Sequence, residues 1–551
     1  MRRLMITGVL AVFIAGGAVL AQSRRGPEWP RLESEILQHF QSVVRMDTSD
    51  PPGNERPVAE YLVQALKAEG IPVQTFESEP SRVNVVARLS GNGRKRPLLL
   101  MAHTDVVTVD PKKWIHPPFS AAREGGYIYG RGTRDDKSHV AAFLMTMLLL
   151  KRLAVPLDRE QEFIRNRFLS KFARSGAVAA VDLVTRGILE SDARTTERLP
   201  AVESNECQPT AKLPHIVLIF DESSFDATLM PGIKVGPDYR QHFRSFDGKE
   251  RKLLVEGAGG PSWFTEYNML TGLSVRSYGR FAESVTRLAA GHVERGLAHA
   301  LRHCGYRTHS MYPYYGAFVG ARRFHTGAGI ERFFDAENLG GFKRTDSHYF
   351  DFALRTITWE RTGAPMFLFV YTAANHFPWN SRYRPDLQSD WRNLGNRSDV
   401  DEYLRRQAMS AQDYPRFLKR LREEFPDESF LLVRFGDHQP LFAKYFVDPT
   451  LDEAAVAKRI QAYDPRYLTT YYAIDTVNFT PADLSSALDT LDAPYLPLLL
   501  LEAAGVPLDP SFEEQKRILQ RCNGLFYACK EGAEASRFNR LLIDAGLING
   551  L

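Results

Sequence analysis

The chain has 551 residues, of which 44% are hydrophobic and 25% charged, and a formal net charge of +4 at pH 7. This length exceeds that of one ordinary domain and predicts two or more. The composition is typical of a soluble globular protein. The small charge, without a basic stripe interleaved with aromatic residues, argues against a nucleic-acid partner.

The N-terminus has the layout of a secretory signal. Two arginines precede an apolar run at residues 4–20, and small residues come before Gln22. Cleavage after Ala21 would make residues 1–21 a signal peptide and the mature chain extracytoplasmic, in the periplasm or secreted. The alternative is an uncleaved segment that anchors the protein, because the run is close to the length that spans a membrane.

Residues 30–158 alternate helical and strand patterns, which predicts an α/β layer. A strongly apolar segment at 139–153 has the length of a buried helix. Further helices are expected at 31–46 and 57–70, and strands at 71–78, 84–90 and 97–105.

Two phrases in this part are typical of a metal site. His103 and Asp105 follow the apolar run in LLLMAHTDVV, and Asp135 and Asp136 lie in the glycine-rich phrase GRGTRDDK before the apolar helix. An imidazole at a strand end, with a carboxylate some thirty residues further on, is a plausible zinc site.

Together with WIHPPFS and YIYGRG, these phrases resemble the start of the aminoacylase/carboxypeptidase-type zinc peptidases. The resemblance implies that His103 is a metal ligand, that Asp105 orients it, and that Asp135 bridges two zinc ions. It stops near residue 158, where relatives continue into a strand ending in Glu-Glu that supplies the general base. We therefore expect a truncated domain with a vestigial site and no peptidase turnover, able at most to hold zinc weakly.

The character of the sequence changes near residue 160. Amphipathic helices are expected at 163–193, within a helical linker that covers residues 160–212. From residue 213 onward, strand-length apolar runs resume.

Three of these runs, at 215–220, 366–372 and 429–435, are continuously apolar, which predicts strands buried on both faces of a parallel sheet. The polar residues that follow them are Asp221-Glu222-Ser223, Asn375-His376 and Asp437-His438. Because ligands in open α/β sheets bind beyond the carboxyl ends of the strands, these residues predict one site.

Glu222, Asp437 and His438 offer two carboxylates and one imidazole, a set that suits zinc or manganese. Ser262, in EGAGGPSWFTE, is expected at a helix start, where backbone amides favour an oxyanion. Coordination to the metal would lower the pKa of its hydroxyl and make it a nucleophile.

The phrases FDESSFD, GGPSWFTE, ANHFPW and FGDHQP, in this order, resemble the sulfatase-like branch of the alkaline phosphatase superfamily, most closely lipoteichoic acid synthases and phosphoethanolamine transferases. The resemblance covers about 213 to 505 and implies a three-layer α/β domain with a mainly parallel sheet. It also implies that His376 contacts the transferred anionic group or the leaving oxygen. The metal and nucleophile centre that it implies consists of Glu222, Ser262, Asp437 and His438.

The segment ARRF at 321–324 occupies the region where relatives bind the anion, so Arg322 or Arg323 is expected to bind the substrate. Sulfatases that form formylglycine carry x-Pro-x-Arg after the nucleophile position, whereas Trp-Phe-Thr follows Ser262. We therefore expect the serine to attack phosphorus directly, through a covalent seryl intermediate.

Four cysteines, an even number, suit an oxidising compartment. Cys522 and Cys529 are close enough in sequence to bridge a small loop. Four unpaired, buried thiols, with Cys207 and Cys304 as the other two, are the alternative.

These features predict an extracytoplasmic, metal-dependent hydrolase or transferase of phosphate or sulfate esters, with lipid or glycan head groups as candidate substrates and a membrane surface as a candidate partner. One alternative is a zinc-dependent aminoacylase-like amidohydrolase, inactive because its site is incomplete. Another is a non-functional fusion of two gene fragments, since LSKFARSG at 169–176 resembles a helix that follows membrane spans in relatives. The expected parts are 1–21 (signal peptide), 30–158 (truncated zinc-peptidase-like domain), 160–212 (helical linker), 213–505 (sulfatase-like catalytic domain) and 506–551 (C-terminal tail).

Overall fold

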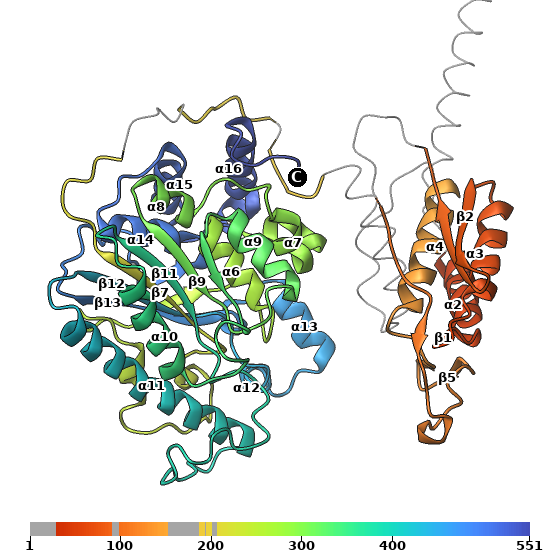
Figure 1. Cartoon of the computed structure of the whole chain (residues 1–551), viewed down its shortest axis with the longest axis horizontal. Helices are drawn as coiled ribbons and strands as arrows, with labels where there is room; N and C mark the ends of the chain where they lie inside the picture. The colour runs from red at the N-terminus through yellow and green to blue at the C-terminus, as the bar shows by residue number, and fades with distance from the viewer. Residues whose placement is uncertain (1–28, 91–98, 153–186, 193, 201–206) are drawn as a thin grey trace, which may run out of the picture. The chain divides into compact units, whose positions relative to one another are not determined.

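The computed structural model of the protein describes residues 29–90, 99–152, 187–192, 194–200 and 207–551. Contacts divide the chain into two compact units, Met1–Gly187 and Ile188–Leu551, each considered by itself (Figure 1). The signal peptide expected at 1–21 and most of the helical stretch expected at 163–193 lie outside the described residues. The described end of that stretch, residues 187–192, is irregular.

Three helices form the core of the first unit: α2 (Trp29–Arg45), α3 (Arg56–Ala68) and α4 (Lys137–Arg152). Ile36 of α2, Leu66 of α3 and Met145 of α4 belong to one buried cluster. The helices expected at 31–46, 57–70 and 139–153 are therefore present, because each presents an apolar side to the others.

The strands of this unit form separate pairs. The parallel pair is β1 (Ser49–Asp50) with β4 (Val106–Val107), and the antiparallel pairs are β2 (Val73–Glu79) with β3 (Arg82–Ala87) and β5 (Ala122–Glu124) with β6 (Tyr127–Tyr129). A short 3-10 helix, η1 (Pro111–Lys113), follows β4.

The strand expected at 97–105 is wrong over its described part. Residues 99–105 form no strand, and Leu99 and Met101 are 74% and 75% exposed. The physical reason is that no described strand pairs with this run, and an apolar run becomes a stable strand only when a neighbouring strand pairs with it.

The second unit contains a sheet of eight strands in the order β10-β9-β11-β7-β12-β13-β8-β14. The first five run parallel to one another, β13 is antiparallel to both of its neighbours, and β14 is parallel to β8. The strands are β7 (His215–Asp221), β8 (Arg251–Leu254), β9 (Arg307–Met311), β10 (Arg332–Phe334), β11 (Met366–Tyr371), β12 (Phe430–Gly436), β13 (Thr469–Val477) and β14 (Thr490–Asp492).

The strands expected at 215–220, 366–372 and 429–435 correspond to β7, β11 and β12. They lie side by side in the middle of the sheet, and every residue of the three is buried. Burial on both faces explains why their sequences are continuously apolar rather than alternating.

Helices cover both faces of this sheet (Figure 1). Val217 and Ile219 of β7 pack in one core cluster with α10 (Asp346–Trp359) and α11 (Ser398–Glu424). Ile216 and Leu218 pack on the other face, with α6 (Ser262–Thr271), α8 (Leu297–His303) and α14 (Leu496–Ala504). The alternation follows the two-residue period of a strand.

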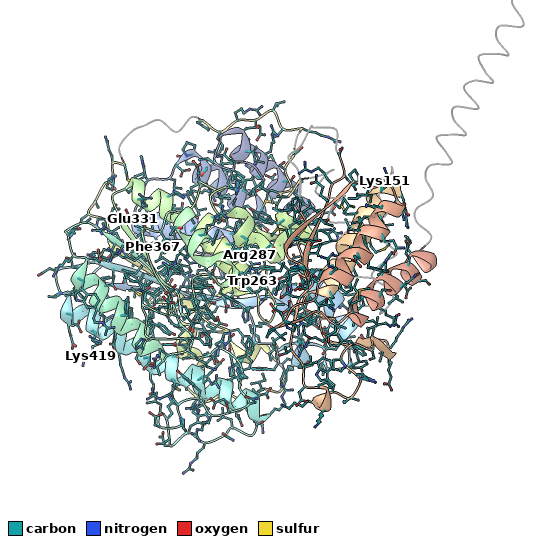
Figure 2. All side chains as sticks on the ribbon, turned by 45° about the vertical axis from the view of Figure 1, so that its right-hand side comes forward. Lys151, Trp263, Arg287, Glu331, Phe367 and Lys419 are labelled. Carbon is teal, nitrogen blue, oxygen red and sulfur yellow. A yellow bond between two sulfur atoms is a disulfide. The ribbon has the colours of Figure 1, made fainter. Side chains whose placement is uncertain are left out.

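Figure 2 shows Phe367 of β11 among the interior side chains and Lys419 on the exposed side of α11. The expected fold, a three-layer α/β domain with a mainly parallel sheet, is confirmed.

The short helices of this unit that have not been named so far are α7 (Val285–Ala289), α9 (Ala321–Gly327), α12 (Lys444–Val447), α13 (Glu453–Gln461), η2 (Ala227–Leu229), η3 (Tyr239–Phe243), η4 (Val275–Ser284), η5 (Phe318–Gly320), η6 (Pro465–Tyr467), η7 (Ala493–Tyr495) and η8 (Cys529–Gly532).

Residues 506–551, expected as a C-terminal tail, contain α15 (Pro510–Cys522) and α16 (Ala533–Asp544). Phe512 and Phe538 of these helices are buried in the same core as Leu189, which belongs to the expected linker. This part of the chain is therefore a packed portion of the second unit.

Two disulfide bonds join Cys207 to Cys304 and Cys522 to Cys529. The alternative of four unpaired thiols is therefore wrong. Among the helices that the structure describes, none combines the length and apolarity needed to cross a bilayer.

Candidate functional site

Two parallel strands end together at the candidate site. Gly436, the last residue of β12, lies opposite Asp221 at the end of β7. A Cβ atom on Gly436 would meet the carbonyl oxygen of Ser224 at 1.8 Å, so only glycine allows the chains after these strands to approach this closely.

This approach brings together Glu222, after β7, and Asp437 and His438, after β12. Their exposed fractions are 1%, 0% and 3%. One ligating atom of each lies within 4.8 Å of the others, and in the described parts of the chain this is the one such group of three. These three residues are called the ligand cluster below.

Ser262 is the first residue of α6 and faces the ligand cluster. Its Oγ lies 3.4 Å from Glu222 Oε2 and 3.3 Å from His438 Nε2. Thr265, one turn further along α6, donates a hydrogen bond to the carbonyl oxygen of Asp437 at 2.8 Å and so ties the helix to the end of β12. A hydroxyl oxygen at this position is favourably placed to carry negative charge, because free backbone N–H groups gather at a helix N-terminus.

Asp437 has one oxygen that the surrounding protein leaves unsatisfied. Its Oδ2 is buried, makes no hydrogen bond and lies 3.2 Å from His438 Nε2. Burial and then the charge of Glu222 raise the pKa of Asp437 well above its usual value, and burial lowers the pKa of His438. Two carboxyl groups and an imidazole around an unpartnered buried oxygen form a donor set that fits a divalent cation.

Two tyrosine hydroxyls hold the Glu222 carboxylate. Tyr371, the last residue of β11, donates to Oε2 at 2.8 Å, and Tyr314 donates to the same oxygen at 3.3 Å. Tyr371 ends a strand that was expected at this edge of the sheet, so its position was open to prediction. Tyr314 lies in a loop after β9 and belongs to no motif.

His376 borders this cluster through aromatic contacts. Its ring lies 5.7 Å from the ring of Tyr314 and stacks on Phe377 at 4.4 Å. Burial lowers the pKa of His376, and the charge of Glu222 opposes that shift. Tyr314 thus lies between His376 and Glu222, since its ring contacts the imidazole and its hydroxyl donates to the carboxylate.

Lys343 is a cation near the cluster that no sequence motif indicated. Burial, and then the charge of Arg406, lowers its pKa to about 8, while the charge of Glu222 acts in the opposite direction. The charge of Lys343 also lowers the pKa of His376. Its Nζ lies 3.5 Å from the carbonyl oxygen of Phe377.

Arg322 and Arg323, the expected anion-binding residues, lie on the exposed side of α9. Arg322 pairs with Asp335 at 2.5 Å and donates to the carbonyl oxygen of Phe333 at 3.4 Å. The hydrogen bonds found for Arg322 thus run to β10 and the loop after it, and none joins the ligand cluster.

The residues of the first unit that were expected to form a vestigial peptidase site also come together, but at the surface. His103 Nε2 lies 3.0 Å from Asp135 Oδ1, and His103 Nδ1 lies 3.3 Å from Asp105 Oδ1. The side chains of His103 and Asp135 are 49% and 87% exposed. Asp136 accepts a hydrogen bond from the backbone N–H of His103 and pairs with His139.

Two protein-family models match segments of this chain, one in each unit. The sulfatase family model matches residues 214–465, and the model of peptidase family M20/M25/M40 matches residues 99–164. Residues 214–465 are therefore similar to the sulfatase family, and residues 99–164 are similar to part of the M20/M25/M40 peptidase family. Both resemblances drawn from the sequence motifs are confirmed.

Curated relatives match the first unit. The succinyl-diaminopimelate desuccinylase of Delftia acidovorans is 36% identical over 119 residues, which are 21% of this chain and 30% of that protein. A probable succinyl-diaminopimelate desuccinylase of Staphylococcus aureus is 34% identical over 121 residues, 22% of this chain and 29% of that protein. The chain thus spans about 30% of the length of these relatives.

Solved structures align over more than half of the chain. A Streptococcus pyogenes phosphoglycerol transferase in complex with sn-glycerol-1-phosphate has a TM-score of 0.47 and 14% identity, covering 63% of this chain and 92% of that one. A lipoteichoic acid synthase from Listeria monocytogenes has a TM-score of 0.40 and 14% identity, covering 57% and 77%. A zinc complex of the C-terminal periplasmic domain of EptC from Escherichia coli has a TM-score of 0.38 and 13% identity, covering 57% and 89%.

Proposed function

We propose that residues 213–505 form a metal-dependent enzyme that hydrolyses or transfers phosphate esters, or sulfate esters, through Ser262. The observation that carries this proposal is the position of the Ser262 hydroxyl. It lies at the start of a helix, within 3.4 Å of both Glu222 and His438 and beside the unpartnered buried oxygen of Asp437. The residues proposed to hold one zinc or manganese ion are Glu222, Ser262, Asp437 and His438.

A cation held there would lower the pKa of the Ser262 hydroxyl and offset the negative charge of the substrate. Ser262 Oγ attacks the phosphorus atom, so that a new O–P bond forms while the bond to the leaving oxygen breaks, and the proton of the serine hydroxyl ends on the departing alcohol. Water, or the hydroxyl of an acceptor, then attacks the phosphoserine and releases Ser262 with its proton. Hydrolysis and transfer differ only in this second nucleophile.

Two further groups are proposed to contact the anion. His376 hydrogen-bonds the transferred group or the leaving oxygen, in keeping with its contact with Tyr314. Lys343 supplies positive charge, which the effect of its charge on His376 supports. Arg322 and Arg323 are kept as candidates of the same kind, although Arg322 already pairs with Asp335.

The proposed location is outside the cytoplasm, and the proposed substrates carry a lipid or glycan head group. The two disulfide bonds support this location, because such bonds persist in oxidising compartments. Fractionation of cells that express the full chain, with an antibody against it, tests the location.

The nucleophile is tested with purified full-length protein, with zinc and with manganese, on p-nitrophenyl phosphate, a phosphodiester and p-nitrophenyl sulfate. Ser262→Ala should abolish turnover of whichever ester reacts. Ser284→Ala, which removes an exposed hydroxyl at the start of α7, is the matched control and should act like the wild type. Equal turnover by Ser262→Ala and the wild type would remove Ser262 from the proposal.

A second candidate function is that of an aminoacylase-like amidohydrolase, which the first unit would carry with His103 and Asp135. The 3.0 Å contact between these side chains favours it. We propose that this unit does not turn over N-acyl substrates, in keeping with the exposed position of both side chains. Release of amino acid from N-acyl substrates by the full chain, lost in His103→Ala, would contradict this proposal. The fusion alternative requires that neither assay shows turnover.

A further inference from the structure

Arg406 of α11 lies beneath the loop that carries His376. The arginine is only 1% exposed. One of its Nη atoms donates to the carbonyl oxygen of His376 at 2.9 Å, and the other donates to the carbonyl oxygens of Pro378 and Ser381 at 2.9 and 3.1 Å. One buried side chain thus holds both ends of the segment 376–381, which is called the His376 loop below.

The His376 loop has no regular secondary structure that would satisfy these carbonyl oxygens. Its residues form neither strand nor helix, and a carbonyl oxygen turned towards the interior needs a donor. A guanidinium carries its N–H groups in a rigid, planar fork, so one arginine can reach several acceptors in fixed positions. A lysine has the same charge, but all its donors sit on one nitrogen atom, so it cannot span the same three oxygens.

A carboxylate compensates the buried charge of Arg406. The Nε of Arg406 donates to Glu402 Oε1, one turn earlier on α11, at 2.6 Å. Glu402 also accepts from the backbone N–H of Tyr383 at 2.9 Å, so the chain just after the His376 loop is tied to the same pair. Such a pair persists because breaking it would leave an unpaired charge in the interior.

Lys343 reaches the same loop from the segment before α10. Its Nζ lies 3.5 Å from the carbonyl oxygen of Phe377, the residue between the first two whose carbonyl oxygens Arg406 engages. The hydroxyl of Tyr383 donates to the backbone carbonyl oxygen of Lys343 at 2.8 Å. Lys343 and Arg406 therefore hold neighbouring carbonyl groups of one loop.

The charge of Arg406 also acts on Lys343. After burial, the charge of Arg406 is the next cause that lowers the pKa of Lys343, whereas the charges of Glu402 and Glu222 raise it. The ring of Tyr383 lies against both cations, with its centre 5.3 Å from Lys343 Nζ and 5.3 Å from Arg406 Cζ. Without the charge of Arg406, Lys343 would keep its proton to a higher pH.

We propose that Arg406 is a positioning residue, which holds the His376 loop and so fixes His376 and Lys343 around the anionic group of the substrate. This inference rests on the proposed function. Arg406 acts through the loop, since its hydrogen bonds run to Glu402 and to the three carbonyl oxygens. The rate depends on its forked shape, and the pH at which Lys343 loses its charge depends on its charge.

The test uses full-length protein, the ester that reacts and the metal that supports turnover. Arg406→Lys keeps the charge and loses the fork, whereas Arg406→Gln loses both. We expect kcat per folded chain to fall about 10²-fold in both variants, because a displacement of about 1 Å at a reacting group costs that much. The pH at which KM rises should move upward in Arg406→Gln and stay in place in Arg406→Lys.

The folded fraction of each variant is measured by circular dichroism. If Arg406→Gln does not fold because Glu402 is left unpaired, the double variant Arg406→Gln with Glu402→Gln leaves no buried charge without a partner. Its kcat per folded chain should fall as in the single variants.

Arg405→Lys is the matched control. Arg405 is equally buried on the same helix and also pairs with Glu402, at 2.9 Å. Its other hydrogen bonds run to the carbonyl oxygens of Leu387 and Tyr383, which lie outside the His376 loop. We expect the wild-type kcat per folded chain and the wild-type pH profile of KM in this variant.

A purely structural role for Arg406 would lower the folded fraction and leave kcat per folded chain unchanged. An unchanged kcat per folded chain in both Arg406 variants, or an unmoved KM profile in Arg406→Gln, would overturn the inference. With an inactive Ser262→Ala, that result leaves the proposed function intact. Turnover retained by Ser262→Ala would overturn the proposed function instead, and a wild-type chain that turns over none of the esters would overturn both.

Discussion

In each unit of this protein, an imidazole and a carboxylate follow an apolar run: His103 and Asp105 in the first unit, Asp437 and His438 in the second. The run before Asp437 is β12, paired with β7 on one side and β13 on the other. The run before His103 forms no strand over residues 99–105. The second pair is buried, and the first lies at the surface.

The difference shows what turns such a phrase into a site. Exposed charges are solvated and interact weakly, so His103 and Asp135 can pair without needing a further ligand. Buried charges lose their hydration and must be compensated, and Asp437 Oδ2 is left without a donor. A sheet that buries its own strand ends therefore leaves a carboxyl oxygen of Asp437 without a partner, which the proposed cation would supply, whereas His103 and Asp135 stay exposed to solvent.

The largest effect is expected when one carboxylate is substituted at each of the two sites, Asp437 in the second unit and Asp135 in the first. Asp437→Asn should lower turnover of the phosphate ester about 10³-fold or more, as loss of a group on which the reaction depends does. It should also remove the bound ion. Asp135→Asn should leave both properties unchanged. Elemental analysis per chain and steady-state kinetics measure the two effects, and an ion retained in Asp437→Asn but lost in Asp135→Asn would reverse the comparison.

All four cysteines lie in the second unit, so disulfide removal should act on that unit alone. Cys207→Ser with Cys304→Ser opens a link across 97 residues and should lower the free energy of unfolding by about 4.7 kcal/mol, because the unfolded chain gains freedom. Opening Cys522–Cys529, with a separation of 7, should cost about 2 kcal/mol. Denaturant unfolding of the full chain, followed for each transition, measures both. Equal costs for the two pairs would contradict the loop-length argument.

Apolar residues of the two runs should differ in their contribution to stability. Ile219 in β7 is 1% exposed, and Ile219→Ala should lower the free energy of unfolding by about 3 kcal/mol, through lost burial and the cavity that remains. Met101 is 75% exposed, and Met101→Ala should change the free energy of unfolding by less than about 0.5 kcal/mol. Chemical denaturation measures both values. A large loss in Met101→Ala would show that the run before His103 is buried after all.

The smallest expected effect concerns Lys343, whose pKa is lowered to about 8, chiefly by burial. A lysine is charged below its pKa, so its attraction for an anionic ester is present at pH 7 and is lost as the pH rises through 8. KM should therefore rise about tenfold between pH 7 and pH 9, since a hydrogen bond to a charged group contributes about 1.5 kcal/mol or more.

Lys343→Arg should abolish this rise, because a guanidinium stays charged over the whole range. Lys419→Arg, on the exposed side of α11, is the control and should keep the wild-type pH profile. A rise that persists unchanged in Lys343→Arg would assign the pH dependence to another group.

Much of the second unit was predictable from local patterns. Continuous apolar runs indicated β7, β11 and β12, and the residues that follow two of them form the ligand cluster. Ser262 was indicated by the glycine-rich turn before α6. Lys343 and Tyr314 were not predictable, because each comes from a loop and approaches Glu222 only through the arrangement of the whole sheet.

The sequence by itself determined which segments are apolar enough to become strands and helices, and which families the motifs belong to, because hydrophobic periodicity and motif spacing are local properties. Only the tertiary structure decided which apolar runs find a partner strand, which cysteines meet, and how Arg406 reaches three carbonyl oxygens of one loop. These depend on contacts between residues far apart in the chain. For Glu222 and Asp437 they depend on the parallel pairing of β7 with β12, which sets Gly436 opposite Asp221 and buries the charges between the two strand ends.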